Sequence, residues 1–572
     1  MATNATKKRK QQQRQAVLRL MILAAILVCV NILAAYLHTG LDLTKEKRFT
    51  LTKPTKKLLS SMNDVAVIDI YLEGKDLTAG YRRLHEAIRE KMEDFRAIAG
   101  KHVLYRFIDP YEGKNDMEIK AMQQEFYEKG LEYAKLTSGS AKGGSIQYIY
   151  PGAVVHYNGK DLSVNLMEHH AGLDPLANLT YSESQLEYKF ANAIHNLSLP
   201  DKPRIAYVTG NGELVDYHMY DFFTTIPRYY HLDTLDLPNT IVIPGAYKAI
   251  IIAKPLTELT PRELYTVDQY IMYGGNVLWA VDMLDAQMDS LRKTGQLITH
   301  DYNLRVSEFL FKYGARLNSD LIEDNLSVTM PIYEQGNMVS YKWVYFPVII
   351  PMSTHPVVKN MGAIFTRFVG SVDTVGHDNQ ISKTVLLASS IHSRTATNPV
   401  RITGAMIANP PGVEQLKGPS QPIAVLLEGK FKSNFLNRLT DEGIKTLNGI
   451  YKPFKPATDS LGKQIVISDG DIFSNDFSVR ENRPLEMGLW MATNEYFDNK
   501  TFLLNCLDYL TDNSGLLEAR SKEMQLRLLD PQRVIDEKST WQSVNIILPS
   551  ALVLIFASAF IFFKKRRYEK TA

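Results

Sequence analysis

Cysteine is nearly absent from this chain, since only two cysteines occur among its 572 residues. Cys29 lies in a long uncharged run near the amino end, whereas Cys506 lies in the apolar run 502–510, which predicts a buried helix. These separate environments leave neither cysteine a partner, so we expect no disulfide and no C-x-x-C redox site. The folded domains must therefore be held together by their apolar cores alone.

The motifs of several enzyme classes are also missing. The sequence has no G-x-x-x-x-G-K-[ST] loop, no G-x-S-x-G elbow and no H-E-x-x-H pair. Those motifs supply a phosphate cradle, an activated serine and a catalytic zinc site. Neither cysteine suits a nucleophile, which needs a tight strand-to-helix turn and a histidine base. We therefore expect no ATP hydrolysis by this chain, and a fold that serves binding or scaffolding.

Two clusters contain residue types that bind metals. Glu168, His169 and His170 are adjacent, and adjacent side chains point apart and seldom ligate one ion. Three aspartates at 469, 471 and 476 follow a predicted strand and could gather a hard cation. Their spacing lacks the glycine and glutamate of a calcium loop, so a capped turn is favoured. We expect neither a metal nor another cofactor.

Charge is absent from two long stretches, 20–37 and 544–563. Each is close to the roughly 20 residues that a helix needs to cross a hydrocarbon core. Basic residues lie at 7–19, before the first stretch, and at 564–567, after the second. This pattern predicts two membrane spans with both chain ends in the cytoplasm. A buried core helix is the alternative for either stretch, and a cleaved signal peptide is the alternative for the first.

Most of the positive charge lies in the two tails. The formal net charge is +3, and the tails together carry more positive charge than that, so the region between the spans is net acidic. Basic tails beside membrane spans are expected to contact lipid, and they are no sign of a nucleic-acid surface. We therefore expect membrane lipid as a partner and no nucleic acid.

Three short apolar runs indicate a parallel sheet in the middle of the chain. They cover residues 205–209, 249–253 and 277–281, and continuous apolar runs suit strands that are covered on both faces. Between the second and third runs, residues 260–263 form a capping box with proline in the first turn, and a glycine pair at 274–275 ends the helix. Strand–helix–strand order with a right-handed crossover predicts a doubly wound α/β layer.

Polar side chains follow the predicted strands at their carboxyl ends. Asn211 and Glu213 follow the first strand, Lys254 the second and Asp282 the third. Ligands of open α/β sheets bind at this edge, so these four residues are the candidate ligand-binding site. Carboxylates beside an amide suit hydroxyl or amino groups, as in a sugar or an amine. The alternative is plain turn chemistry, with Glu213 stabilising a helix start.

The region before this layer has its own strand and helix pattern. Residues 64–75 and 103–109 read as strands, and apolar residues at helical spacing over 84–98 lie between them. Further strands follow, with a turn at residues 158–159. We interpret residues 63–200 as a small α/β domain, thioredoxin-like in layout.

Seven short motifs lie in order along nearly the whole chain. They are D-L-T at 42–44, R-F-T-L-T at 48–52, Y-L-E-G at 71–74, V-T-G-N-G-E at 208–213, G-G-N-V at 274–277, D-G-D at 469–471 and N-C-L-D-Y-L at 505–510.

In this order and spacing, the motifs make the chain resemble the GldG-like family of gliding-motility auxiliary proteins of ABC-type transporters in Bacteroidota. The resemblance implies that the chain works with a polytopic permease and a separate cytoplasmic ATPase. It also implies that the central region is similar to a domain of an intraflagellar-transport protein and to class I glutamine-amidotransferase folds.

The motifs, spans and resemblance together predict a non-catalytic accessory subunit, substrate-binding-like or coupling, of an ABC-type transport complex in the bacterial inner membrane. The predicted fold is an α/β periplasmic ectodomain that contains the thioredoxin-like domain and a doubly wound, amidotransferase-like domain, with one transmembrane helix at each end. The alternative function is a membrane-anchored periplasmic hydrolase or a glycan-binding protein that acts on cell-envelope material.

The expected boundaries follow from these patterns. A charged stalk helix should join the ectodomain to the second span, with Arg520 and Arg527 facing the partner subunits. The expected parts are a basic tail (1–16), a first span (17–38), a linker (39–62), the small α/β domain (63–200), the central α/β domain (201–512) with an insertion near 322–422, the stalk (513–542), a second span (543–563) and a basic tail (564–572).

Overall fold

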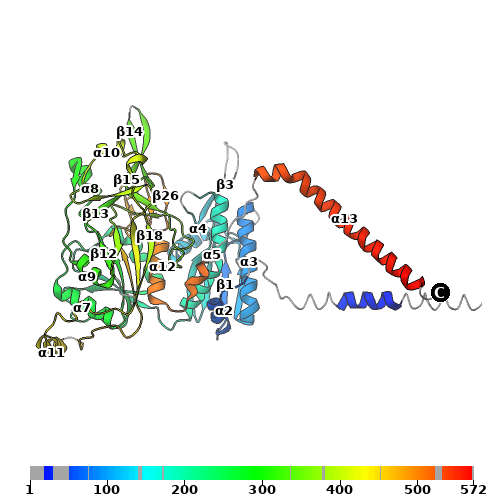
Figure 1. Cartoon of the computed structure of the whole chain (residues 1–572), viewed down its shortest axis with the longest axis horizontal. Helices are drawn as coiled ribbons and strands as arrows, with labels where there is room; N and C mark the ends of the chain where they lie inside the picture. The colour runs from blue at the N-terminus through cyan, green and yellow to red at the C-terminus, as the bar shows by residue number, and fades with distance from the viewer. Residues whose placement is uncertain are drawn as a thin grey trace, which may run out of the picture. The chain divides into compact units, whose positions relative to one another are not determined.

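The computed structural model describes residues 18–29, 50–74, 77–138, 145–170, 173–334, 336–376, 380–450, 452–521 and 531–569. The chain divides into two compact units between residues 523 and 524, and each unit is described by itself. The larger unit is a mixed α/β structure, as the sequence predicts (Figure 1).

A four-stranded mixed sheet forms the first part of the larger unit. Its strand order is β2-β1-β5-β6, with β1 and β2 parallel and the other neighbouring pairs antiparallel. The predicted turn at 158–159 joins β5 to β6, and both of its residues have positive φ. The strands are β1 (Ala66–Ile70), β2 (Val103–Phe107), β5 (Gly152–Tyr157) and β6 (Lys160–Asn165), and a separate hairpin pairs β3 (Ala134–Ser138) with β4 (Ser145–Ile149).

Helices cover this sheet and bury the apolar residues that the sequence pattern selects. In α3 (Ala79–Ala99) the side chains of Leu84, Ile88, Met92 and Phe95 are fully buried. The long helix α5 begins at Pro175, earlier than the predicted residue 182, because Asp174 caps it through the N–H groups of residues 176 and 177. The other helices here are α2 (Lys53–Ser60), capped by Thr52, and α4 (Asp116–Lys129).

The central sheet has seven strands in the order β18-β21-β22-β10-β9-β7-β8. Five strands, from β22 to β8, are parallel. At one edge β21 pairs antiparallel with β22, and β18 pairs antiparallel with β21. The three predicted strands are β7, β9 and β10, so the sequence places the middle of the sheet correctly. The bounds are β7 (Arg204–Thr209), β8 (His231–Asp236), β9 (Tyr247–Ala253), β10 (Asn276–Ala280), β18 (Ile381–Ala388), β21 (Pro422–Gly429) and β22 (Gly462–Ile467).

Helix α7 (Pro261–Met272) connects β9 to β10 and has the predicted start and end. Thr260 accepts a hydrogen bond from the N–H of Glu263, whose carboxylate accepts one from the N–H of Thr260 in return. Such a capping box typically contributes about 1 kcal/mol. The N–H groups of Gly274 and Gly275 donate back to the carbonyls of the last turn and end the helix.

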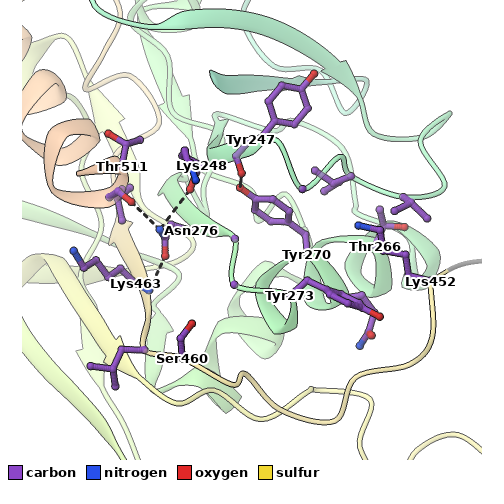
Figure 2. Close-up of a pocket in the computed structure, with 18 of the residues that line it drawn as sticks. Tyr247, Lys248, Thr266, Tyr270, Tyr273, Asn276, Lys452, Ser460, Lys463 and Thr511 are labelled. Atoms are coloured by element: carbon purple, nitrogen blue, oxygen red, sulfur yellow. Dashed lines mark hydrogen bonds between the residues drawn. The ribbon is translucent and has the colours of Figure 1, made fainter. Parts of the chain in front are cut away.

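The two edges of the parallel strands differ. Loops that follow β7, β9, β10 and β22 gather polar and charged residues at the carboxyl edge. A cavity of about 340 Å³ opens at the opposite, amino edge, where Tyr247, Asn276 and Lys463 begin or adjoin their strands (Figure 2).

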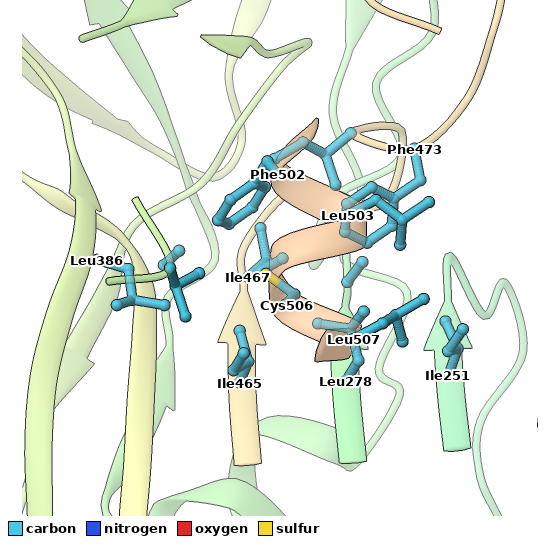
Figure 3. Close-up of a cluster of buried hydrophobic side chains, with 14 of the residues drawn as sticks. Ile251, Leu278, Leu386, Ile465, Ile467, Phe473, Phe502, Leu503, Cys506 and Leu507 are labelled. Atoms are coloured by element: carbon cyan, nitrogen blue, oxygen red, sulfur yellow. The ribbon is translucent and has the colours of Figure 1, made fainter. Parts of the chain in front are cut away.

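Apolar layers cover both faces of the sheet, which explains the continuous apolar runs of its strands. Helix α7 lies on one face, where Leu264, Val267 and Ile271 pack against alternate residues of β9 and β10. Helix α12 (Asn499–Thr511) covers the other face across β9, β10 and β22 (Figure 3). Its residues Phe502 and Cys506 are fully buried there, so the helix around Cys506 is buried as predicted.

The region 322–422, least clear in the sequence, has two parts. Strand β18 joins the edge of the central sheet, whereas Trp343, Tyr345 and Phe346 of the long hairpin β14–β15 form a separate aromatic core. The elements of this region and its approach are β11 (Gln296–Ile298), β12 (Ala315–Leu317), β13 (Asp320–Asp324), β14 (Ser327–Glu334), β15 (Asn337–Ile349), β16 (Ile364–Phe365), β17 (Val372–Thr374), β19 (Ser393–Thr397), β20 (Arg401–Thr403), α8 (Met288–Thr294), α9 (Val306–Tyr313) and α10 (Ala405–Ala408).

The smaller elements occupy the remaining loops of the central domain. A short helix α6 (Tyr220–Thr225) follows the β7 loop, and α11 (Asp441–Ile450) lies between β21 and β22. Two short two-stranded sheets precede α12. They are β23 (Phe477–Ser478) with β24 (Arg483–Pro484), and β25 (Leu489–Trp490) with β26 (Glu495–Tyr496).

The expected stalk differs from the sequence prediction where it is described. Residues Leu516–Ser521 form a short 3₁₀ helix against α5, and Arg520 is only 3% exposed. Its guanidinium donates to Asn505 and to the Tyr181 hydroxyl. The prediction that Arg520 faces a partner is therefore wrong, because internal hydrogen bonds and burial outweigh the helical charge pattern. Arg527 lies outside the described residues.

The smaller unit contains α13 (Pro531–Glu569). Its part Glu537–Arg566 is long and apolar enough to cross a membrane. Near the amino end, Leu18–Cys29 is a shorter apolar helix, and the rest of the predicted first span lies outside the described residues. By length and composition, the carboxyl-terminal helix is consistent with membrane association.

Candidate functional site at the carboxyl edge of the central sheet

The four residues predicted to bind a ligand all lie at the carboxyl edge of the parallel strands. Asn211 and Glu213 follow β7, Lys254 follows β9 and Asp282 follows β10. All four are at least nine-tenths buried. Strands β8 and β9 lie on opposite sides of β7, so the chain reverses its direction of winding beside β7, where ligands of such sheets bind.

The contacts of these residues fall into two groups. Lys254 and Asp282 meet the loop after β22, which contributes Asp469, Gly470 and Asp471. Asn211 donates hydrogen bonds both to Glu213 and to the capping residue Glu263 of α7. We name the first set the lysine–aspartate cluster and the second set the asparagine–glutamate cluster.

In the lysine–aspartate cluster one ammonium group forms ion pairs with two carboxylates. Lys254 Nζ lies 3.2 Å from Asp282 Oδ2 and donates a short hydrogen bond to Asp471. The remaining oxygen of Asp282 accepts a hydrogen bond of 2.6 Å from the N–H of Gly470. Asp469 accepts from the N–H of Asp471 and from the N–H of Arg367. The cluster is therefore a closed network, built on the ends of β9, β10 and β22.

Backbone geometry at this point is unusual. Lys254 has φ of +51°, a left-handed conformation that a lysine seldom adopts, and its N–H donates to the carbonyl of Ala280. A Cβ on Gly470 would lie 2.9 Å from Lys254 Cβ and 3.0 Å from Asp282 Oδ2. Only glycine therefore fits at position 470 without displacing the cluster. Residues held in such conformations tend to lie at functional sites.

Burial and neighbouring charge set the protonation of the cluster. Burial raises the pKa of Asp282 to about 6, against the opposing effect of Lys254. Burial also raises the pKa of Asp469 well above its usual range, and the charges of Asp282 and Asp471 add to this. Burial alone would raise the pKa of Asp471, but the charge and hydrogen bond of Lys254 bring it below its ordinary value. The cluster therefore has more carboxyl groups than cations to balance them.

The loop of the three aspartates is a capped turn. Asp471 pairs with Lys254, Asp476 lies 2.9 Å from the Arg367 guanidinium, and Asp469 caps the turn through the N–H of residue 471. Since each carboxylate already has a donor or a cation, the turn interpretation fits these residues better than a cation site. Arg367 was not indicated by any sequence motif.

The asparagine–glutamate cluster joins three loops. The N–H of Asn211 donates to Glu213 over 2.7 Å, and its side-chain amide donates to Glu263 over 3.2 Å. Its carbonyl accepts from the N–H groups of Leu256 and Thr257. Burial raises the pKa of the Glu213 carboxyl. Within the described residues, Asn211 Oδ1 and Glu213 Oε1 are buried acceptor atoms without a hydrogen-bond partner.

One cluster elsewhere could hold a metal by its residue types. Ligand atoms of Glu168, His170 and Asp498 lie within 4.8 Å of one another. The sequence argument that adjacent residues point apart missed this, because Glu168 and His170 are two positions apart and Asp498 is distant in sequence. Lys189 Nζ lies 2.6 Å from Glu168, and the buried Arg520 adds a second positive charge. Two carboxylates are thus already balanced by two cations, which favours an ion network over a metal centre.

Cys506 has the environment of a packing residue. It is fully buried among Ile465, Ile467 and Phe502 on the inner face of α12 (Figure 3). Burial raises the pKa of its thiol well above the ordinary value. A thiolate nucleophile needs the opposite shift and access to substrate, so Cys506 is unsuited to that role.

Comparisons with known proteins come from three directions. Residues 45–156 match a domain family of unknown function, DUF7088. An uncharacterized protein of Borreliella burgdorferi is 21% identical over 532 residues, which cover 90% of this chain and 91% of that protein. Among solved structures, the mmIFT52 N-terminal domain is similar with a TM-score of 0.31 and 12% identity, covering 54% of this chain and 98% of that one.

One family model matches more than half of the chain. Residues 202–506 match the model of the family described as ABC-type uncharacterized transport system. This range includes the whole central sheet and both clusters at its carboxyl edge. The chain therefore belongs to the auxiliary-component family of the ABC-type uncharacterized transport system.

Proposed function

We propose that this chain is a non-catalytic accessory subunit of an ABC-type transport complex, associated with gliding motility as in the GldG-like family that its motifs resemble. The family match over residues 202–506 carries the proposal. The ion-paired carboxyl edge and the inert environment of Cys506 support a binding or coupling role over catalysis. The energy for transport then comes from a partner ATPase, acting on a polytopic permease.

The proposed arrangement has two membrane spans, with both chain ends in the cytoplasm and the ectodomain in the periplasm. The apolar part of α13 supports the second span, and the basic residues at 564–567 support its orientation. For the folds, we propose a thioredoxin-like layout for the β2-β1-β5-β6 sheet and an amidotransferase-like layout for the central sheet.

Co-purification tests this function directly. The intact chain, tagged at its carboxyl end and extracted in mild detergent, should recover a polytopic membrane protein and an ATPase with Walker motifs. The matched control is the same tagged chain with α13 replaced by an unrelated single-span helix. Recovery of neither partner type, under conditions in which the chain remains folded, would contradict the proposal.

A second candidate function is the binding of a glycan or an amine of the cell envelope. The observation that favours it is the pair of unpartnered, buried acceptors on Asn211 and Glu213, which could accept hydrogen bonds from hydroxyl or amino groups. Lys254 and Asp282 would then form one wall, held in place by Asp471.

The test is Glu213→Gln, which keeps the shape and replaces one acceptor oxygen with a donor. If the cluster binds a ligand, the variant should lose function in cells while its thermal midpoint changes by less than about 2 °C. Thr257→Ser, in the same loop, serves as the control. Retained function in the glutamine variant would show that the cluster only holds the loops together.

A further inference from the structure

The cavity at the amino edge of the central sheet lies at the opposite ends of the strands whose carboxyl ends lead into the two clusters. Its volume is about 340 Å³, at the lower end of the range for small-ligand sites. It lies between the carboxyl end of α7, the start of β9 and β10 and the carboxyl end of α12 (Figure 2). A ligand of monosaccharide size would fit a volume of this size.

The charge of the cavity has one sign. Of its twenty lining residues, three are lysines (Lys248, Lys452 and Lys463), and none is aspartate, glutamate, arginine or histidine. The carboxyl ends of two helices also lie here, and each carries a partial charge of about −0.5. Lys463 lies at the end of α12 and has two acids near it, so the remaining two lysines stand against the end of α7 and leave the cavity net positive.

The ammonium group of Lys463 is held by contacts within the protein. Its Nζ donates to the carbonyl of Tyr509 over 2.8 Å and to Asn513 over 3.1 Å, and it lies 4.2 Å from the centroid of the Tyr509 ring. These contacts place its charge at the end of α12, with Glu428 and Asp512 as the nearby acids that act on it. Lys463 therefore serves the helix end and is not the group that an incoming ligand meets.

Lys248 and Lys452 are the exposed lysines of the cavity. The ammonium of Lys452 lies 5.2 Å from the centroid of the Tyr273 ring. It also lies 3.8 Å from the place that a Cβ on Gly245 would occupy, in the segment that leads into Lys248. Lys452 thus reaches across from the loop before β22 toward the segment that leads into β9.

The walls of the cavity are held by internal hydrogen bonds. The Asn276 amide donates to the carbonyl of Leu510 over 2.7 Å, and its oxygen accepts from the N–H of Lys463 over 2.9 Å (Figure 2). The hydroxyl of Tyr270 donates to the carbonyl of Tyr247 over 3.1 Å. A cavity built in this way exists before a ligand arrives, which reduces the entropic cost of binding.

We propose that this cavity binds a small phosphate monoester, with Lys248 and Lys452 contacting the phosphoryl group and the Tyr273 ring lining the site for the rest of the molecule. A phosphate monoester carries a charge between −1.5 and −2 near pH 7, which matches the two exposed lysines. Lysine binds phosphate as a point charge and does not need the paired geometry that arginine provides. The site is separate from the carboxyl edge and does not depend on the proposed transport role.

Binding is measured by isothermal titration calorimetry on the full-length chain in detergent, in a buffer without phosphate. The probes are glucose 6-phosphate, glucuronate and glucose, which share a sugar body and differ in charge. We expect saturable binding of glucose 6-phosphate, weaker at high salt because the lysines are exposed. Glucuronate and glucose should bind at least tenfold more weakly.

The variant Lys248→Gln/Lys452→Gln should weaken the binding of glucose 6-phosphate by about tenfold or more, because two exposed charge contacts are removed. Lys101→Gln/Lys120→Gln is the matched control, since both of these lysines are exposed on the amino-terminal domain and the charge change is identical. The control should bind as the parent chain does. If both variants lost affinity for glucose 6-phosphate equally, the proposal would be overturned, because the loss would then follow from the change in net charge alone.

A second variant blocks the mouth of the cavity without changing any charge. Gly245→Leu would extend a side chain past the 3.8 Å gap toward the Lys452 ammonium and fill the mouth of the cavity. Its φ is outside the left-handed region, so leucine is tolerated by the backbone. We expect this variant to keep its thermal midpoint and to lose binding. Unchanged affinity in the leucine variant, preferred binding of glucuronate or no binding of any probe would each overturn the proposal.

Discussion

Replacing Lys254 with methionine tests whether the lysine–aspartate cluster is held by charge. Methionine has a similar stem, so the main change is the loss of the ammonium between Asp282 and Asp471. Lys254 is 6% exposed and both carboxylates are largely buried, so water cannot replace the missing cation. Removing one partner of a buried ion pair typically costs about 3–5 kcal/mol.

That cost can be converted to a shift in the unfolding temperature. The entropy of unfolding is about 2.1 cal/mol/K per residue, or roughly 1 kcal/mol/K for a unit of this size. If the unit unfolds cooperatively, the thermal midpoint should fall by about 3–5 °C. The assay is scanning fluorimetry of the full-length chain in detergent. Lys101→Met, at an exposed position, should change the midpoint by less than about 1 °C.

The pH dependence provides an independent check. Without Lys254, the folded-state pKa values of Asp282 and Asp471 rise above the unfolded value of about 3.9. Carboxyl groups with raised folded pKa values stabilise the fold at low pH, and this stability is lost as the pH rises through those values. In the parent chain, by contrast, the lowered pKa of Asp471 makes its contribution present above the unfolded pKa. The deficit of the variant should therefore be larger at pH 8 than at pH 5.

A double variant tests whether the lost stability comes from the unpaired carboxylates. Adding Asp471→Asn to Lys254→Met removes one of the stranded carboxylates, so part of the lost stability should return. A fall of less than 1 °C for Lys254→Met, with no dependence on pH, would refute the view that charge pairing holds this edge of the sheet.

Three further predictions concern stability and reactivity. Thr260→Ala should destabilise the fold by about 1 kcal/mol in denaturant titrations, whereas Thr260→Ser should be nearly neutral, because only serine keeps the capping box. Arg520→Met should cost about 3 kcal/mol and speed proteolysis within the larger unit, since its buried hydrogen bonds to Tyr181 and Asn505 are lost; a variant as stable as the parent chain would contradict this. In a Cys29→Ala background, Cys506 should resist maleimide until denaturant is added, and rapid labelling of the native chain would disprove its burial.

Local sequence signals account well for single elements of this fold. The apolar runs of β7, β9 and β10, the capping box of α7 and the apolar helix α13 are each specified by residues close together in the chain. Their physical basis is short-ranged, since periodicity, capping and span length depend on neighbouring residues only. The same signals placed Asn211, Glu213, Lys254 and Asp282 at the carboxyl edge.

What the sequence alone could not decide was which distant segments meet there. The hydrogen bond from Lys254 to Asp471 spans 217 positions, and the contact between His170 and Asp498 spans 328. Burial of Arg520 likewise depends on α5 and α12, which no local pattern around residue 520 reveals. Such pairings arise from the packing of whole layers, in which β22 pairs beside β10 because both of its faces find apolar cover. Local chemistry therefore determined the elements, and long-range packing determined which charges became partners.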